Sequence, residues 1–249
     1  MFHKVEKLSE AANRNVRDAL IEDLGSGDLS AKILTKEKVF AKLVCKSDEA
    51  VLAGQLWFEQ CFKFLDKSIE ITWLCKDGDL IKKNDTVCRI EGYNLPILSG
   101  ERSAINFLQV LSSVSTKTKK YVTLLKDLDL TSCVVLDTRK TIPGLRLAQK
   151  YAVRVGGGKN QRFGLWDSIL IKENHIISVG GLKRLLGRNL SNKLDDHVNL
   201  NVQIEVENLD EFEYVKTVGI KNILLDNFSI DDLNKAVKAN DKNLILEAS

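Results

Sequence analysis

The stretch VVLDTRKTIPGLR, residues 134–146, contains the features that decide the fold. It begins as a short apolar strand, ends that strand on Asp137, and runs directly into Arg139 and Lys140. Charged side chains that follow a buried strand at once are typical of the carboxyl edge of a parallel sheet, where α/β barrel enzymes keep their binding groups. The stretch therefore predicts an α/β fold with a cationic loop at one edge of its sheet.

The Pro143-Gly144 pair in the same stretch predicts a type II turn. Proline fixes φ at the second position of such a turn, and glycine accepts the positive φ of the third at little cost. The turn would form a rigid corner that holds Arg139 and Lys140 in place. A plain loop between a strand and a helix is the alternative.

Downstream of this stretch, apolar strands alternate with helical segments. Strands are expected within residues 132–137, 167–174, 201–208, 221–228 and 243–249, and helices within 145–154, 178–190, 209–219 and 229–240. Buried strands that alternate with helices predict a parallel sheet. The expected strand ends carry charged residues: Asp137 with Arg139 and Lys140, then Lys172, Glu205, Asp226 and Glu247. These would form a ring at the mouth of a barrel, which explains their placement better than the alternative, an open doubly wound sheet.

The first half of the chain has a different texture. Residues 8–24 carry apolar side chains at helical spacing, and Gly25 ends the run. Residues 37–98 form short alternating stretches, which predict an antiparallel sheet covered by one helix around residues 54–65. A long amphipathic helix is expected over 101–128. We therefore predict an N-terminal α/β sandwich domain over residues 1–111 and an α/β barrel domain over 112–249.

Composition excludes several classes of protein. Of the 249 residues, 44% are hydrophobic and 29% charged, as in an ordinary globular domain. The net charge of +3 is mild, and no dense basic run indicates a nucleic-acid surface. No apolar run is long enough for a membrane span, and the first residues lack the apolar core of a secretion signal. Five scattered cysteines without a C-x-x-C pair indicate a cytoplasmic protein with free thiols.

The charged strand ends suit a strongly anionic ligand that arrives with a divalent cation. Guanidinium groups bind carboxylates or phosphates in bidentate fashion, and lysine supplies a compact point charge. Glu205 and Asp226 could hold Mg²⁺, or could stabilise positive charge that develops on a sugar carbon. The alternative for each single charge is a solvated strand cap, but five in succession make that reading poor for the set.

Two weaker features remain open. The glycine run 156–158 permits close backbone approach to a phosphate or to a neighbouring subunit, but it lacks the context of a nucleotide-binding fingerprint. His175 could donate a hydrogen bond to a substrate or only cap a helix.

Several blocks of the chain closely resemble those of the quinolinate phosphoribosyltransferase (nicotinate-nucleotide pyrophosphorylase) family. The matching blocks are EDLGSGDLS (22–30), ERSAINFLQVLSSVSTKTKKYV (101–122), LDTRKTIPGLR (136–146), KYAVRVGGGKNQRFGLWDSILIKENHI (150–176), VQIEVENLDE (202–211) and ILLDNFS (223–229). The resemblance implies an incomplete α/β barrel of the type II phosphoribosyltransferase kind. It implies transfer of the phosphoribosyl group of phosphoribosyl pyrophosphate to quinolinate, with Mg²⁺ present and with loss of CO₂ and pyrophosphate, in de novo NAD biosynthesis. It also implies a homodimer with an active site shared between subunits.

The same resemblance assigns roles to residues. It implies that Arg139, Arg162 and Lys172 bind the quinolinate carboxylates, and that Arg102 reaches across the dimer interface. It implies catalytic roles for Lys140, Glu205 and Asp226, with the two acids near the sugar and the metal. Further substrate contacts are expected from Thr138, Gln161, His175 and Ser249.

The chain departs from the family pattern in two places. Gln161 stands where the family usually has histidine, so we expect weaker or re-tuned quinolinate binding rather than lost function. The sequence ends at Ser249, where the family continues with Gly-Gly and a further strand and helix, so we expect the given chain to be incomplete. Two alternative functions remain. One is a related pyrophosphorylase-like enzyme that acts on another pyridine or a nucleotide, such as the paralogue linked to molybdate transport. The other is a non-catalytic ligand-binding homologue.

Overall fold

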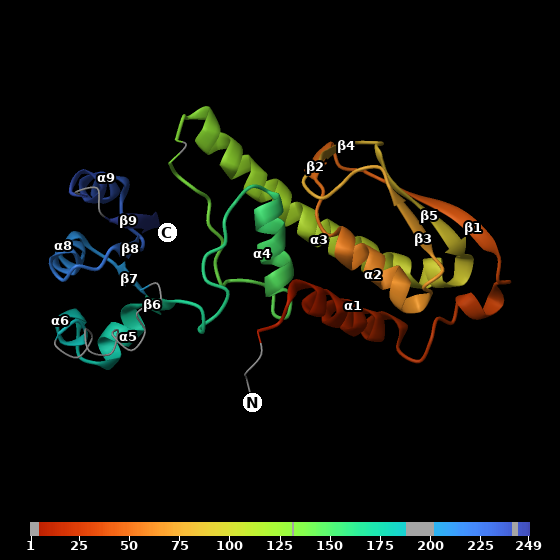
Figure 1. Ribbon diagram of the computed structural model, residues 1–249, viewed down its shortest axis with the longest axis horizontal. Helices are drawn as coiled ribbons and strands as arrows, with labels where there is room; N and C mark the ends of the chain where they lie inside the picture. The colour runs from red at the N-terminus through yellow and green to blue at the C-terminus, as the bar shows by residue number, and fades with distance from the viewer. Residues whose placement is uncertain (1–4, 131, 188–201, 241–243) are drawn as a thin grey trace. The chain divides into compact units, whose positions relative to one another are not determined.

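The computed structural model describes residues 5–130, 132–187, 202–240 and 244–249, which form two compact units, residues 1–161 and 162–249 (Figure 1). The first unit contains α1 (Leu8–Leu24), the 3₁₀ turn η1 (Ala31–Ile33), β1 (Lys38–Val44), β2 (Glu49–Val51), α2 (Gln55–Leu65), β3 (Glu70–Trp73), β4 (Leu80–Lys82), β5 (Thr86–Tyr93), α3 (Asn94–Asp127) and α4 (Arg146–Val155). The second contains β6 (Ile169–Ile171), α5 (Glu173–Ser178), α6 (Leu182–Leu185), β7 (Val202–Val206), α8 (Leu209–Thr217), β8 (Asn222–Leu225), α9 (Ile230–Lys238) and β9 (Ile245–Ala248).

The first unit confirms the predicted helix and antiparallel sheet. Helix α1 ends where Gly25 takes φ +50°, a conformation that glycine adopts at little cost. Strands β1, β5 and β3 pair antiparallel in that order, and β2 pairs with β4. Helices α1 and α2 pack along α3, as Figure 1 shows. Trp57, Phe58 and Phe62 of α2 are almost completely buried and form the centre of this core.

Helix α3 is longer than the 101–128 helix expected from periodicity, because it begins at Asn94. The extra turns contain Pro96, which is tolerated in the first turn of a helix because its missing amide would have no intrahelical partner there. Helix and sheet are thus joined without a loop, since β5 ends at Tyr93.

Helix α4 belongs to the first compact unit. Its Ala148 and Ala152 are fully buried in the same core as α2, and the Tyr151 hydroxyl donates to Asp77 at 2.7 Å. This packing carries the first unit through residue 161. A division by packing is a different quantity from a division into domains, so the boundary expected between residues 111 and 112 stays a prediction; it falls inside the uninterrupted α3.

The second unit is a parallel sheet in sequence order, β6-β7-β8-β9. This confirms the predicted alternation of parallel strands and helices, and the described strands contain no order reversal of the kind that defines a doubly wound sheet. The helices cover one face of the sheet (Figure 1), where the apolar residues Ile204, Val206, Ile223 and Leu225 pack with Phe212 of α8. The helix expected over 178–190 is shorter in the structure: within the described residues 178–187 it is represented by α6, since Ser178 ends α5 and turn and bend residues flank α6, while 188–190 lie outside the described residues.

The strand predicted over 132–137 is wrong as a regular strand. Among the described residues of this segment there is one parallel bridge, between Leu136 and Lys159. The amide of Lys159 donates to Val135 O at 2.9 Å, and the amide of Asp137 donates to Lys159 O at 3.2 Å. In a regular parallel ladder the amide of Gln161 would donate next to the Asp137 carbonyl. It donates instead to the Asp137 side chain, at 2.9 Å from Oδ1, and pairing ends there.

No helix in the described part of the chain is long and apolar enough to cross a membrane.

Candidate active site

The cationic loop after Asp137 is shaped by its own short-range hydrogen bonds. Thr138 Oγ1 accepts from the amide of Lys140 at 2.9 Å, and the carbonyl of Arg139 accepts from the amide of Thr141 at 2.9 Å. The Nε atom of Arg139 is buried and has no hydrogen-bond partner among the described residues. A buried donor without a partner carries a desolvation cost, and an anionic ligand would remove that cost. Thr138, Arg139 and Lys140 thus lie together, with one guanidinium N–H available for a ligand.

The predicted type II corner is confirmed. The amide of Leu145 donates to Ile142 O at 3.0 Å, and Gly144 has φ +80°. The Gly144 carbonyl accepts from Asn15 Nδ2 at 2.9 Å and from Arg14 Nη2 at 3.3 Å. Helix α1 therefore fixes the corner that follows the cationic loop.

Asp137 is held in a nearly closed polar cluster. Its side chain is 7% exposed and forms an ion pair with Lys150 of α4, whose side chain is 1% exposed. Asn160 Nδ2 donates to Asp137 Oδ2 at 2.5 Å and to the Lys150 carbonyl at 2.9 Å. Lys150 Nζ also donates to Gln161 O at 2.9 Å. The main chain of Gln161 is thereby held at its amide by Asp137 and at its carbonyl by Lys150.

Sequence reasoning missed Lys150 and Asn160. Successive helical residues are about 100° apart, so Lys150 projects about 160° away from Ala148 and from Ala152. A helical wheel therefore places Lys150 on the wet face, and only the packed structure shows that it is buried.

The glycine run has an intrachain role that the sequence left open. A Cβ atom on Gly156 would lie 2.4 Å from Ser115 O, and one on Gly158 would lie 2.9 Å from Thr118 Cγ2. Such separations are too short for a side chain, so these glycines let the loop after α4 approach α3 of the same chain. The close approach is made to this helix, and the run leads directly into Asn160.

The parallel sheet of the second unit has a polar face opposite its helices. Because side chains alternate along a strand, Lys172, Glu205 and Asp226 project to the face away from the core residues Ile204 and Leu225. Lys172 Nζ lies 2.7 Å from Glu205 Oε2, with side-chain exposures of 44% for the lysine and 10% for the glutamate. The structure thus brings together a predicted carboxylate binder and a predicted acid.

Asp226 directly follows β8, the strand next to β7. Its amide donates to Val206 O at 3.0 Å, and its Oδ2 accepts from Asn227 Nδ2 at 3.0 Å. Nearby Glu207 has its pKa raised, first by desolvation and then by the charges of acids that include Asp226 and Glu205. The edge of this sheet is therefore an acidic environment in which a cation would be favoured.

The two acids fit Mg²⁺ as outer ligands. Asp226 Oδ1 and Glu205 Oε1 have no hydrogen-bond partner within the described residues, so one oxygen of each carboxylate is available. No group of three or more His, Cys, Asp or Glu residues in the described ranges is placed to hold a metal by itself. Mg²⁺ usually keeps several waters and binds through one or two carboxylates plus substrate phosphates, which matches such a partial set.

The remaining predicted residues have more local surroundings. His175 Nδ1 accepts from the amide of Lys172 at 3.0 Å, so it caps α5, and its contact with a substrate stays a prediction. Ser249 donates its amide to Leu225 O at 3.1 Å and accepts from the amide of Asn227 at 3.2 Å. Arg162 Nη1 lies 3.5 Å from Ser168 O. Arg102 is exposed on α3 and forms no hydrogen bond or ion pair with any residue that the structure describes.

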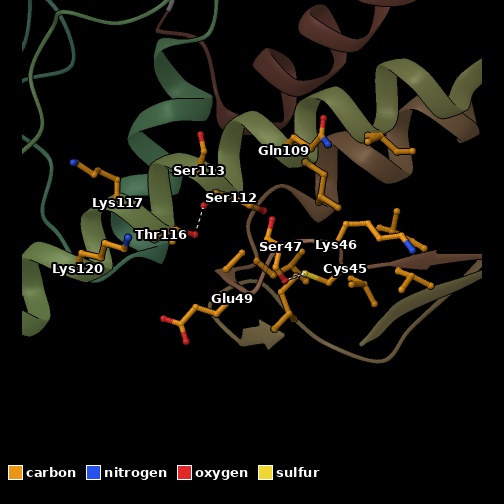
Figure 2. A pocket seen from close by; sticks show the side chains of 18 residues that line it. Cys45, Lys46, Ser47, Glu49, Gln109, Ser112, Ser113, Thr116, Lys117 and Lys120 are labelled. Atoms are coloured by element: carbon orange, nitrogen blue, oxygen red, sulfur yellow. Dashed lines mark hydrogen bonds between the residues drawn. The ribbon is translucent and has the colours of Figure 1, made fainter. Parts of the chain in front are cut away.

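A cavity of about 570 Å³ lies in the first unit beside α3 and the segment from β1 to β2 (Figure 2). None of the predicted site residues lines it. Its polar wall is already used for packing: Thr116 Oγ1 donates to Ser112 O at 2.6 Å and accepts from the amide of Val51 at 2.8 Å. The cavity is therefore separate from the cationic loop.

Comparisons with known proteins identify the relatives of this chain. Residues 27–112 match the model of the quinolinate phosphoribosyl transferase N-terminal domain, and residues 114–249 match that of its C-terminal domain. A probable nicotinate-nucleotide pyrophosphorylase (carboxylating) of Bacillus subtilis is 36% identical over 230 residues, which cover 92% of this chain and 77% of that protein. The chloroplastic enzyme of that name from Arabidopsis thaliana is 34% identical over 224 residues, 86% of this chain and 63% of its own.

Solved structures agree with the sequence relatives. The nicotinate-nucleotide pyrophosphorylase from Francisella tularensis superposes with a TM-score of 0.88 at 38% identity, over 99% of this chain and 86% of that one. NadC from Streptococcus pyogenes superposes with a TM-score of 0.87 at 34% identity, over 99% and 85%. Both domain models, in order, together with these relatives, show that the chain belongs to the quinolinate phosphoribosyl transferase family.

Proposed function

We propose that this protein transfers the phosphoribosyl group of phosphoribosyl pyrophosphate to the ring nitrogen of quinolinate and yields nicotinate mononucleotide, pyrophosphate and CO₂. The observation that carries the proposal is the cationic set Arg139, Lys140, Arg162 and Lys172, retained at the motif positions of a chain that belongs to this family. Quinolinate is a dianion and the donor carries several negative charges, so binding both requires several cations. The reaction belongs to de novo NAD biosynthesis.

The residues act by binding and electrostatics. Arg139 and Arg162 hold the two ring carboxylates through bidentate contacts, and Lys172 supplies a point charge whose position Glu205 fixes. The ring nitrogen attacks C1 of the ribose while the bond to pyrophosphate breaks. Lys140 stabilises the departing charge, and Asp226 and Glu205 stabilise the positive charge that develops on the sugar. Glu205 and Asp226 would hold Mg²⁺, which would supply charge neutralisation for the leaving pyrophosphate.

Decarboxylation follows from the same arrangement. Alkylation gives the ring a positive charge, and the adjacent carbon–carbon bond then breaks with its electron pair directed into the pyridinium ring. CO₂ leaves, and a proton takes its place on the ring carbon. No side chain needs to form a covalent bond, because positioning and charge stabilisation carry both steps.

Release of labelled CO₂ tests the proposal. Quinolinate labelled in the carboxyl group next to the ring nitrogen should release CO₂ only when phosphoribosyl pyrophosphate and Mg²⁺ are both present. Lys140→Met should reduce the rate at least about 100-fold, as expected for a group that stabilises transition-state charge. Lys159→Met, which changes an exposed lysine, is the matched control and should keep full activity. A nucleotide product formed without CO₂ would favour the enzyme acting on another pyridine, and quinolinate binding without turnover would favour the non-catalytic homologue.

The proposal includes a homodimer in which Arg102 serves the partner's active site. Its support is that Arg102 is an exposed arginine without a partner among the described residues. Arg102→Ala and Arg139→Ala should each be inactive alone, and mixing the two chains should restore up to about a quarter of the wild-type activity, since one of the two sites in each mixed dimer is intact. Mixed chains that stay inactive would contradict the shared site.

We place the protein in the cytoplasm. All five cysteines are free thiols, as expected in a reducing compartment. Redox-sensitive labelling of the thiols in intact cells would test this location.

A further inference from the structure

The buried Asp137–Lys150 pair is the strongest feature that the proposed reaction does not use. A buried ion pair adds little net stability, because the desolvation of both charges offsets their attraction, and apolar residues of the same volume often serve as well. A pair that is nonetheless almost completely buried calls for a reason other than stability. Its hydrogen bonds supply one, because the two side chains bond to Asn160 and Gln161, in a segment that leads into a predicted substrate-binding residue.

We propose that Asp137 and Lys150 are positioning residues that fix the two anion-binding segments of the chain, residues 138–140 and 160–162, relative to each other. This inference rests on the proposed function for the substrate it names, but the clamp itself is a property of the folded chain.

The first half of the clamp is the Asp137 carboxylate. Thr138 and the two cations that follow it extend directly from this residue, so its position sets where the cationic loop begins. Oδ1 accepts from the amide of Gln161 at 2.9 Å, and Oδ2 accepts from Asn160 Nδ2 at 2.5 Å. One carboxylate therefore joins the start of the first segment to two consecutive residues of the second.

The second half of the clamp is the Lys150 ammonium group. It contacts Asp137 Oδ1 and donates to the carbonyl of Gln161 at 2.9 Å. The peptide groups on both sides of Gln161 are consequently fixed, and the direction in which its side chain leaves the backbone is fixed with them. Arg162 follows immediately, so the same bonds set the origin of the next predicted carboxylate binder.

The scaffold behind the clamp is rigid. Lys150 lies in the middle of α4, and Ala148 and Ala152 of that helix are fully buried in the first core. The glycine run packs the connection between α4 and Asn160 against α3. The connection from α4 to residues 160–162 is thus held at both ends, and the bonds of Asp137 and Lys150 hold the start of the cationic loop against it.

The inference makes a quantitative prediction for binding. A displacement of about 1 Å at a reacting group can cost about 100-fold in rate. Lys150→Met keeps an unbranched side chain that is one atom shorter, but removes the donor to Gln161 and the partner of Asp137. We expect kcat/KM for quinolinate to fall about 10- to 100-fold in the folded variant, with the Michaelis constant for quinolinate increasing several-fold. Lys159→Met, on the same loop but exposed, should change neither.

A positioning role is separated from a structural one by the double variant Asp137→Asn/Lys150→Met. Removing both charges relieves the uncompensated charge of either single variant, so thermal stability should recover. The donor to the Gln161 carbonyl is still absent, so kcat/KM should stay low. Stability and kcat/KM that recover together would overturn the proposal, and so would a folded Lys150→Met variant with wild-type kcat/KM. Should Lys150→Met not fold, Asp137→Asn keeps the shape of the side chain and is expected to show the same fall in kcat/KM; wild-type kinetics there would also overturn it.

Amide hydrogen exchange on the full chain tests the clamp without any substrate. In the wild type, the amides of Lys159 and Gln161 should exchange slowly, and Lys150→Met should accelerate Gln161 at least about tenfold while exchange in α2 is unchanged. A wild-type chain that is inactive on quinolinate yet shows this pattern would contradict the proposed function and keep the clamp. An active wild type whose Gln161 exchange is unaffected by Lys150→Met would contradict the clamp and keep the function.

Discussion

Asn15→Ala should destabilise the protein by about 2–4 kcal/mol, although Asn15 lies far in sequence from the cationic loop. Asn15 is 6% exposed, and its side-chain amide makes two hydrogen bonds, one as an acceptor and one as a donor. Oδ1 accepts from Trp57 Nε1 at 3.2 Å, and Nδ2 donates to Gly144 O at 2.9 Å. Trp57 is fully buried, so its indole N–H would lose its partner without gaining water, at a cost of about 1–3 kcal/mol. The Gly144 carbonyl would still accept a hydrogen bond from Arg14, so loss of its bond to Asn15 would lower the free energy of unfolding by about 0.5–1.5 kcal/mol.

The assay is urea unfolding followed by circular dichroism, with Asn13→Ala as the matched control. Asn13 is exposed on the same helix, so its substitution should change the free energy of unfolding by less than about 0.5 kcal/mol. Trp57→Phe removes the indole donor. It should therefore cost about 1–2 kcal/mol less in the Asn15→Ala background than in the wild type, because the orphaned N–H is then absent.

The kinetic consequence has the same origin. Without Asn15 the type II corner at Gly144 is held by the partly buried Arg14 through a longer hydrogen bond of 3.3 Å, and the cationic loop before it gains freedom. The Michaelis constant for quinolinate should increase several-fold while Asn13→Ala leaves it unchanged. Strict additivity of Asn15→Ala and Trp57→Phe, or a loss in Asn15→Ala below about 0.5 kcal/mol, would refute the reasoning.

Three substitutions and one thiol-labelling experiment should have defined outcomes. Gln161→His should lower the Michaelis constant for quinolinate about fivefold below pH 6.5, because a protonated imidazole adds about 1 kcal/mol of charge-assisted hydrogen bonding. Steady-state kinetics across pH 5.5–8 should show that this effect fades with rising pH. Glu205→Gln should lower kcat about 100-fold, and Lys172→Met should mainly raise the Michaelis constant for quinolinate. Both variants should change the free energy of unfolding by less than about 1 kcal/mol, because Lys172 is half exposed. Cys133 is exposed and should react first with a thiol reagent at pH 8, as the kinetics of the reaction with the reagent would show, whereas burial raises the pKa of Cys61 to about 12. Because this pKa exceeds the unfolded value of about 8.5, the stability from the neutral Cys61 thiol is fully present below about pH 8.5 and is lost as the pH rises towards 12, which alkaline unfolding would measure.

Local sequence chemistry was enough to predict the corner and the sheet of the second unit. Gly144 has the positive φ that a Pro-Gly pair predicts, because that preference is set by the backbone of two residues alone. Strand β8 contains the apolar run Ile223–Leu225 and is followed by Asp226, and β7 carries Glu205 near its carboxyl end between Ile204 and Val206, so both acids lie on the predicted edge. These features depend on neighbours in sequence, so the sequence contains them.

Features that depend on distant packing could not be predicted. The stretch 132–137 has the composition of a strand, but its pairing ends at one bridge because a side-chain oxygen of Asp137 replaces the next backbone acceptor. Lys150 has the helical position of an exposed residue and is buried only because α4 is covered on its second side. The predicted roles of Arg102 and Ser249 stay predictions.

The packing of α4 also explains why the cationic loop belongs to the first compact unit. Asp137 is fixed by Lys150 of α4, and Gly144 is fixed by Asn15 of α1, so both ends of the loop are held by helices of the first core. A loop anchored at both ends loses little conformational entropy when it binds a ligand, because that entropy was already lost on folding. The loss of conformational entropy at Arg139 and Lys140 is therefore offset on folding, by the burial of Trp57, Phe58 and Phe62 in that core. Less of the binding energy of an anionic ligand is then needed to order the loop.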